Sequence, residues 1–317
     1  MHQEIITIVR SGFGSGLAAK DTYSFGDRIL GFLVLLRPIF FIMTPLNAAS
    51  AVVLGLVSYP SWSQCLLGFC AVALAGAAVN TFNDYVDRER DRYLWQTRSI
   101  PNGRVKPGEV LVLVAVFTAA SLSMTWFLFN PLTFYILLLA IALGFFYSAY
   151  LRDKIGYLSL PPIVGLIYLG GWAAFSPETL FNNLLPWYLY FLGVAWQAAH
   201  IMIYYPLHII PKIEGKSAAK VPPALFFVVS PQVAVRIGIG FIGLTLLLSI
   251  LLPLLAPLGV LYYILILAAG IYTISNALAL LKNTSSRGHG LKSFASLSIL
   301  RLTISAAILL SVIINSY

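Results

Sequence analysis

The chain has 317 residues, of which 59% are hydrophobic and only 10% are charged, and its mean hydropathy is +0.88. Soluble domains carry about 25% charged residues, so the composition excludes a soluble globular protein and indicates an integral membrane protein. The formal charge of +9 would suggest a nucleic-acid partner in a soluble protein. In a membrane protein this positive charge has a simpler cause, the basic connections on one side of the bundle described below. We therefore expect no nucleic-acid partner.

Nine apolar segments each come near the ~20 residues that a helix needs to cross a bilayer. The sequence therefore predicts an all-α fold, a polytopic membrane bundle of nine transmembrane helices. We expect residues 1–29 to form an N-terminal tail and residues 30–317 to form the bundle as one domain. The predicted spans are 30–57, 65–83, 108–128, 132–150, 157–175, 185–206, 233–253, 257–281 and 293–315.

The basic residues lie on one side of this predicted bundle. Lys and Arg occupy the N-terminal tail, the connections after spans two, four, six and eight, and the ends of the adjoining spans, whereas the other connections carry one charge, Glu178. Basic connections stay in the cytoplasm by the positive-inside rule, and an odd number of spans puts the termini on opposite sides. We expect a multi-pass protein with a cytoplasmic N-terminus and a basic rim that attracts anionic lipid headgroups.

The stretch 80–91 follows the second apolar segment and holds three of the chain's six aspartates. On a helix, at ~100° per residue, the three carboxylates and two nearby asparagines fall in or beside an arc of about 60°. Arg88, Arg90 and Arg92 are expected to point elsewhere. Mg²⁺ prefers oxygen ligands and is often coordinated by protein carboxylates and substrate phosphates together. The pattern favours a Mg²⁺ site at the aspartates over a solvated loop of self-neutralising ion pairs; the residues are Asn80, Asn83, Asp84, Asp87 and Asp91.

Basic side chains flank this face and suit phosphate contacts, since arginine binds phosphate through two nitrogens at once. A turn around Pro101 and Gly103 would bring the arginines on either side back toward the carboxylates. Another arginine, inside the first apolar segment, needs an anionic partner. The candidate phosphate-binding residues are Arg37, Arg98, Arg104, Arg152 and Lys154, with lipid-headgroup anchoring as the alternative for Arg104.

Aromatic and apolar side chains continue from this face into the predicted bilayer, so a lipid diphosphate would suit the site. Mg²⁺ and basic groups stabilise charge on a departing diphosphate, and aromatic faces stabilise an allylic carbocation. Tyr147, at the end of span four, is the candidate catalytic aromatic residue. The expected ligands are a lipid diphosphate and Mg²⁺.

Two motifs carry a resemblance to a known family. Asn-Asp-x-x-Asp-x-x-x-Asp at 83–91 and Arg-Ser-Ile-Pro-Asn-Gly-Arg at 98–104 resemble the sequences of the UbiA family of intramembrane prenyltransferases, with one departure at Ser99. The Tyr-Ser pair at 147–148 is also similar, and the resemblance covers roughly residues 30–315. It implies nine transmembrane helices and Mg²⁺-dependent transfer of a prenyl chain from an allylic diphosphate to a lipophilic acceptor.

The loop after span six departs from the family's second aspartate-rich motif. Lys212 and Lys216 stand where the resemblance places carboxylates, and His208 lies just before them. An ammonium group cannot bind Mg²⁺, but it can contact a diphosphate oxygen. We expect lysine charge to replace a second Mg²⁺ here, with solvated positive-inside lysines as the alternative.

Three functions compete on this sequence. The motifs at 83–91 and 98–104 favour a prenyltransferase. A terpene cyclase on the same scaffold would ionise the diphosphate without a second substrate, and a catalytically silent lipid-binding protein would explain the altered second motif. A transporter is disfavoured because the ionisable residues gather at one face, whereas transporter sites lie near the membrane midplane.

The predicted topology can be tested with a reporter fused after Tyr317. An enzyme reporter that is active only outside the cytoplasm should be active there, because nine spans carry the C-terminus across the membrane. The same reporter in the connection after span eight should be inactive. Cytoplasmic location of the C-terminal reporter would contradict the odd number of spans.

Overall fold

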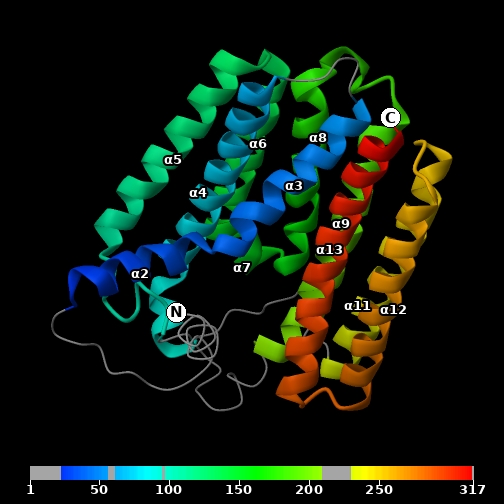
Figure 1. Ribbon diagram of the computed structural model, residues 1–317. Helices are drawn as coiled ribbons and strands as arrows, with labels where there is room; N and C mark the ends of the chain where they lie inside the picture. Colours follow the sequence, from blue (N-terminus) through cyan, green and yellow to red (C-terminus); the bar gives the residue numbers. More distant parts are fainter. Residues whose placement is uncertain (1–22, 56–60, 95–96, 209–229, 316–317) are drawn as a thin grey trace.

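The computed structural model describes residues 23–55, 61–94, 97–208 and 230–315, and these form a bundle of long helices (Figure 1). From α3 onward, consecutive long helices run in opposite directions through the bundle (Figure 1). The long helices are α2 (Phe25–Leu36), α3 (Pro38–Gly55), α4 (Trp62–Leu94), α5 (Pro107–Leu128), α6 (Pro131–Phe146), α8 (Pro161–Phe175), α9 (Leu184–His208), α11 (Pro231–Leu251), α12 (Val260–Lys282) and α13 (Arg287–Asn315).

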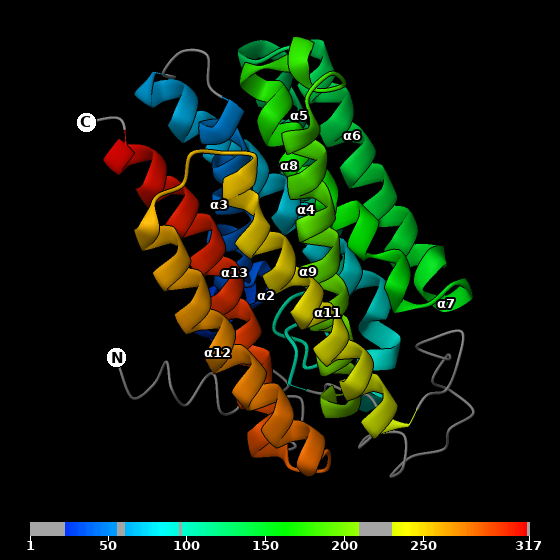
Figure 2. The same ribbon diagram turned by 90° about the vertical axis from the view of Figure 1, so that its right-hand side faces the viewer.

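Eight helical segments of the described chain are long and apolar enough to cross a membrane, with α2 and α3 counted as one segment. Helix α9 is also long, with 25 residues, but it is more polar, since it carries Gln197 and His200, both buried. Figure 2 shows α9 and α11 side by side, and α9 also packs against α8 and α13. The prediction of an all-α polytopic bundle is confirmed.

The first span is two helices instead of the single helix predicted over 30–57. Helix α2 begins at Phe25, where the Ser24 side chain accepts a hydrogen bond from the Asp27 backbone N–H. It ends at Arg37, whose φ of 50° is the only positive value at a non-glycine residue in the described chain. Pro38 disfavours a helical conformation at the residue before it, so the helix breaks and α2 lies at an angle to α3 (Figure 1).

Helix α4 continues past the predicted span at 65–83 and ends only at Leu94. Its 33 residues extend about 50 Å at ~1.5 Å per residue, longer than the ~30 Å hydrocarbon core of a bilayer. The extra turns carry the aspartates predicted to lie on a helix. We call the end of the bundle that holds Asp84, Asp87 and Asp91 the motif end.

Helices α3 and α8 approach closely at Gly171. A Cβ atom built on Gly171 would lie 2.4 Å from the backbone oxygen of Ala48 on α3. No side chain fits in that gap, so glycine is required for the contact between these two helices.

Replacing Gly171 should therefore destabilise the bundle. We expect Gly171→Ala to lower the free energy of unfolding by about 1–3 kcal/mol, the usual penalty for overpacking, although alanine is the better helix former. Thermal unfolding in detergent measures this. Gly243→Ala is the matched control, because a Cβ there meets nothing within 4 Å; equal melting temperatures for the two variants would contradict the prediction.

Candidate active site

Three aspartates of α4 lie on its inner face at the motif end. Asp84, Asp87 and Asp91 are 6%, 7% and 2% exposed, and their spacing of three and four residues places them one above the other on one side of the helix. Ionised carboxylates are rarely buried without partners. The position of these side chains therefore depends on the cations around them.

Arginines from two other segments hold Asp84 and Asp91. Arg37, at the break between α2 and α3, forms an ion pair with Asp84 Oδ1. Arg98 Nη1 donates to Asp84 Oδ1 at 3.1 Å and to Asp91 Oδ2 at 2.6 Å. Burial alone would lower the pKa of Arg98, but Asp84 and Asp91 outweigh it and raise the pKa, so this guanidinium stays protonated. The prediction that Arg37 needs an anionic partner is confirmed.

Asp87 is held by two further arginines. Both terminal nitrogens of Arg152 donate to its carboxylate, with Nη1 to Oδ2 at 2.7 Å. Arg90, three residues on along α4, also pairs with Asp87. The expectation that the arginines of this stretch all point elsewhere is wrong for Arg90, because its long side chain reaches back one turn.

A π-helical turn, η1 (Tyr147–Leu151), separates α6 from the short helix α7 (Arg152–Lys154). Such turns, with hydrogen bonds from residue i to i+5, occur frequently at functional sites. Tyr147 and Ser148 are buried in this turn, and Ser148 Oγ accepts a hydrogen bond from Asn83 at 3.2 Å. The turn thus places Tyr147, Ser148 and Arg152 opposite the acidic face of α4.

The connection after α4 folds back on α2. Gly103, with a φ of 83°, donates its N–H to the carbonyl of Ile100. Ser99 Oγ donates to the carbonyl of Gly31 on α2 at 2.7 Å, so the residue that departs from the family pattern anchors the turn. This fixes Arg98 beside the aspartates and confirms the turn predicted around Pro101 and Gly103.

Other predicted residues lie elsewhere. The Arg104 guanidinium lies 5.9 Å from the centroid of the Tyr23 ring, and the exposed Lys154 ammonium lies 6.0 Å from that of Tyr150. Neither is among the residues that line the cavity described below, so their proposed contacts to phosphate have no support in this geometry. Lys212, Lys216 and the side chain of His208 lie outside the described part of the structure.

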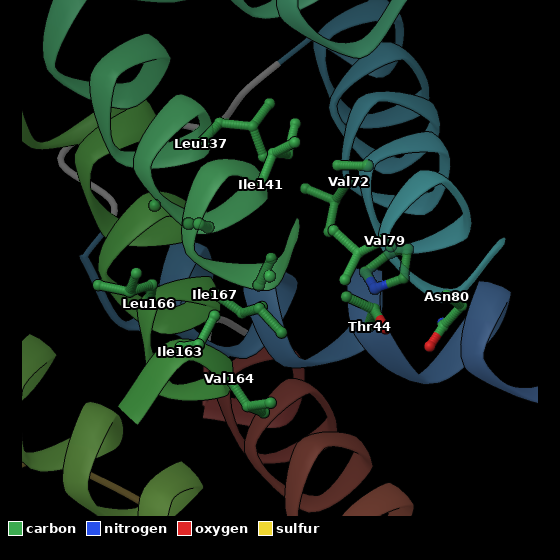
Figure 3. Close-up of a pocket in the computed structure, with 18 of the residues that line it drawn as sticks. Thr44, Val72, Val79, Asn80, Leu137, Ile141, Ile163, Val164, Leu166 and Ile167 are labelled. Atoms are coloured by element: carbon green, nitrogen blue, oxygen red, sulfur yellow. The ribbon is translucent and has the colours of Figure 1, made fainter. Parts of the chain in front are cut away.

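A cavity of about 1090 Å³ begins at the motif end and runs between α3, α4, α6, α8, α9 and α13. Asn80, Asn83, Asp87, Asp91, Arg37, Arg90, Arg98, Tyr147 and Arg152 line its polar part. The chamber beyond them is apolar; Figure 3 shows Val72, Val79, Ile141, Ile163 and Ile167 around it. Its lining continues to Trp62, Phe129 and Phe175 at the opposite end of the bundle. The cavity suits an amphiphile with a compact anionic head and a long apolar tail.

The aspartates are suitable in type for a hard divalent cation. Among the hydrogen bonds between described residues, Arg37 and Arg98 bind Oδ1 of Asp84, and Arg98 binds Oδ2 of Asp91. The second oxygen of each carboxylate is a ligand of the type that Mg²⁺ prefers. Within the described residues, however, no three His, Cys, Asp or Glu side chains form a ready-made metal cluster. Assignment of Asp84, Asp87 and Asp91 to Mg²⁺ thus stays a prediction.

Arg301 lines the cavity although the sequence analysis assigned it no role. Arg301 was counted at the end of a span, but it lies in the middle of α13, is 5% exposed and lines the cavity. The sequence does contain a signal for Arg301, because it is an arginine inside an apolar segment, as Arg37 is. Gln197 and His200 of α9 line the same part of the cavity.

A model of the UbiA prenyltransferase family matches residues 42–300. The chain belongs to this family. A protoheme IX farnesyltransferase from Acidiphilium cryptum (strain JF-5) is 28% identical over 288 residues, 84% of this chain and 80% of that protein. A 4-hydroxybenzoate octaprenyltransferase from Vibrio vulnificus (strain CMCP6) is 28% identical over 180 residues, 55% of this chain and 58% of that protein.

Solved structures share the fold of this UbiA-family prenyltransferase. The apo structure of a UbiA homolog from Aeropyrum pernix K1 matches with a TM-score of 0.68 at 19% identity, over 89% of this chain and 99% of that one. A UbiA homolog from Archaeoglobus fulgidus bound to GPP and Mg²⁺ matches with a TM-score of 0.60 at 20% identity, over 88% and 99%. The predicted membership of the UbiA family is confirmed by the family model, and the solved structures confirm the fold.

The ion pair between Asp87 and Arg152 should dominate the stability of the motif end. Asp87→Asn keeps the shape but leaves a guanidinium that is only 4% exposed with the partly exposed Asp153, 3.3 Å from its Nε, as its remaining counterion. We therefore expect a loss of about 3 kcal/mol, the lower end of the range for a broken buried ion pair. Chemical denaturation in detergent measures it. Glu89→Gln on the exposed side of the same helix is the control and should change stability by under ~1 kcal/mol. Equal stability of the two variants would contradict this.

Proposed function

We propose that this UbiA-family prenyltransferase moves a prenyl group from an allylic diphosphate, bound at the motif end, to a lipophilic acceptor. The observation that supports this is the shape of one cavity, in which arginines and aspartates line one end and apolar side chains line the rest. A prenyl diphosphate has the same division between an anionic head and an apolar tail. Its tail would extend toward Trp62 and Phe129, with membrane lipid around the bundle.

The arginines are the proposed diphosphate ligands. Arg37, Arg90, Arg98 and Arg152 all line the cavity, and each guanidinium has five N–H donors, more than its carboxylate contacts use. Lys212, Lys216 and His208 remain proposed further contacts. As the bond between C1 and the diphosphate oxygen breaks, its electrons leave with the diphosphate, and these cations stabilise the negative charge that develops there.

Asp84, Asp87 and Asp91 are the proposed Mg²⁺ ligands. When bound, Mg²⁺ would neutralise charge on the departing diphosphate. The ring of Tyr147 lines the cavity, so its face can stabilise positive charge on the allylic carbon. The acceptor then attacks C1 and the new bond forms, with loss of a proton from the acceptor.

The family does not fix the acceptor. The named relatives include a protoheme IX farnesyltransferase and a 4-hydroxybenzoate octaprenyltransferase, which differ in acceptor. A lipophilic acceptor suits the described cavity, because apolar side chains between membrane-spanning helices form most of its lining.

Product analysis with a labelled allylic diphosphate tests the proposal. Membranes containing the protein should convert it to a coupled lipid, and removal of divalent cations by a chelator should stop the conversion until Mg²⁺ is restored. Asp84→Asn and Asp91→Asn should each lower turnover by about 10²–10³-fold, the usual effect of a lost preorganised electrostatic contact. Glu89→Gln should leave turnover unchanged.

Other products would support the other functions. A cyclised hydrocarbon or alcohol without acceptor would indicate a terpene cyclase, and binding without any product would indicate a silent lipid-binding protein. Turnover near that of the unchanged protein in both Asp84→Asn and Asp91→Asn would refute the assignment of the aspartates.

A further inference from the structure

A second polar group lines the cavity far from the aspartates. Arg301 follows Arg287, the first residue of α13, by 14 residues, or about 21 Å at ~1.5 Å per residue. This places it deep in a membrane-spanning helix, where an ionisable residue is by default a functional candidate. Gln197 and His200 lie on the neighbouring helix α9, and all three are nine-tenths or more buried.

Arg301 has no acidic partner among the described residues. Its guanidinium carbon lies 4.3 Å from the centroid of the Trp196 ring, it interacts with the Tyr168 hydroxyl, and its Nε makes no hydrogen bond. Tyr168 is itself oriented by donating to Asn47 Oδ1 at 3.0 Å. A phenol and a ring face do not neutralise a desolvated cation, so the site is complementary to an anion.

The arginines of the motif end make a useful contrast. Arg37, Arg98 and Arg152 each pair with a carboxylate of α4, whereas Arg301 faces the same cavity without one. A planar guanidinium binds a carboxylate through two parallel hydrogen bonds. The Nε2 atom of His200 is also buried without a partner and offers a further polar contact beside it.

Aromatic rings connect this group to the motif end. The His200 ring stacks on Trp196 with centroids 4.9 Å apart and lies 4.5 Å from Phe294. The Phe294 ring lies 5.8 Å from that of Tyr204, and Tyr204 lines the cavity together with Arg98 and Asp91 of the motif end. A flat aromatic molecule would stack against such a wall.

The distance between the two polar groups limits the size of that molecule. Gln197 and Tyr204 are seven residues apart on α9, or about 10 Å along the helix axis. One or two fused aromatic rings span this distance. A ligand with its carboxylate at Arg301 would extend its opposite edge toward Tyr204 and the motif end, where the diphosphate is proposed to bind.

We propose that Arg301, with Gln197 and His200, binds the carboxylate of an aromatic acceptor. This inference rests on the proposed function, since it names the acceptor of the same cavity. The acceptor would enter with its carboxylate toward α13 and its nucleophilic edge toward the motif end.

The test is equilibrium binding to the purified protein in detergent, without prenyl diphosphate. The probes are 4-hydroxybenzoate and 1-hydroxy-2-naphthoate, each paired with its uncharged carboxamide. The unchanged protein should bind at least one carboxylate more tightly than its amide. Arg301→Gln should weaken that carboxylate by about 10–100-fold, as expected for a lost charge-assisted contact, and leave the amide unaffected.

Arg236→Gln is the matched control, since it removes the same charge from an exposed position on α11 and should leave binding unchanged. Geranyl diphosphate should bind Arg301→Gln and the unchanged protein alike. If geranyl diphosphate does not bind either protein, the proposed function fails; if it binds but neither carboxylate is preferred to its amide, the acceptor subsite fails.

A stability measurement separates a binding role from a structural one. Arg301→Met removes an uncompensated buried charge and keeps an apolar side chain, so without ligand its melting temperature should equal or exceed that of the unchanged protein. A lower melting temperature together with undiminished carboxylate binding would assign Arg301 to packing and overturn the proposal.

Discussion

Buried charges need counterions, and this requirement organises the motif end of the molecule. Three aspartates of α4 lie almost entirely out of solvent, and each is neutralised by arginine. Those arginines come from the break after α2, the turn after α4 and the junction of α6 with α7. Because each cation belongs to a different segment, the ion pairs fix how these segments sit relative to one another. The same groups, with the exception of Asp84, line the polar end of the cavity.

Local chain chemistry supports this arrangement at two places. The proline after Arg37 ends α2 and leaves Arg37 at the corner, from which its side chain reaches Asp84. The turn at Gly103 places Arg98 against the acidic face of α4. Ser99 joins that turn to α2 by a hydrogen bond. A helix break and a glycine turn thus bring cations to carboxylates 47 and 14 residues away, and the long helix α4 holds those carboxylates near the mouth of an apolar chamber.

The cavity contains two kinds of arginine. Those at the motif end pair with carboxylates, so they stay neutralised whether or not the proposed diphosphate is bound. Arg301 is surrounded by aromatic rings and has no acidic partner in the described chain. In a low-dielectric interior the electrostatic difference between a paired and an unpaired arginine is large. It supports a proposed head-group site and a proposed acceptor site at the two ends of the row of aromatic rings formed by Trp196, His200, Phe294 and Tyr204.

The sequence by itself determined the membrane-spanning helical bundle, because apolar length and the depletion of charge depend only on composition. It also determined that the aspartates share one helical face and that the chain resembles the UbiA family. Only the tertiary structure decided that Arg90 turns inward, that Arg104 and Lys154 lie away from the cavity, and that Arg301 lines it. Helical spacing determines the face of the helix from which a side chain begins. The direction of a long arginine side chain depends on its partner, and for Arg37 and Arg152 that partner is 47 and 65 residues away in sequence. Tertiary packing brings these partners together, and no local sequence pattern predicts it.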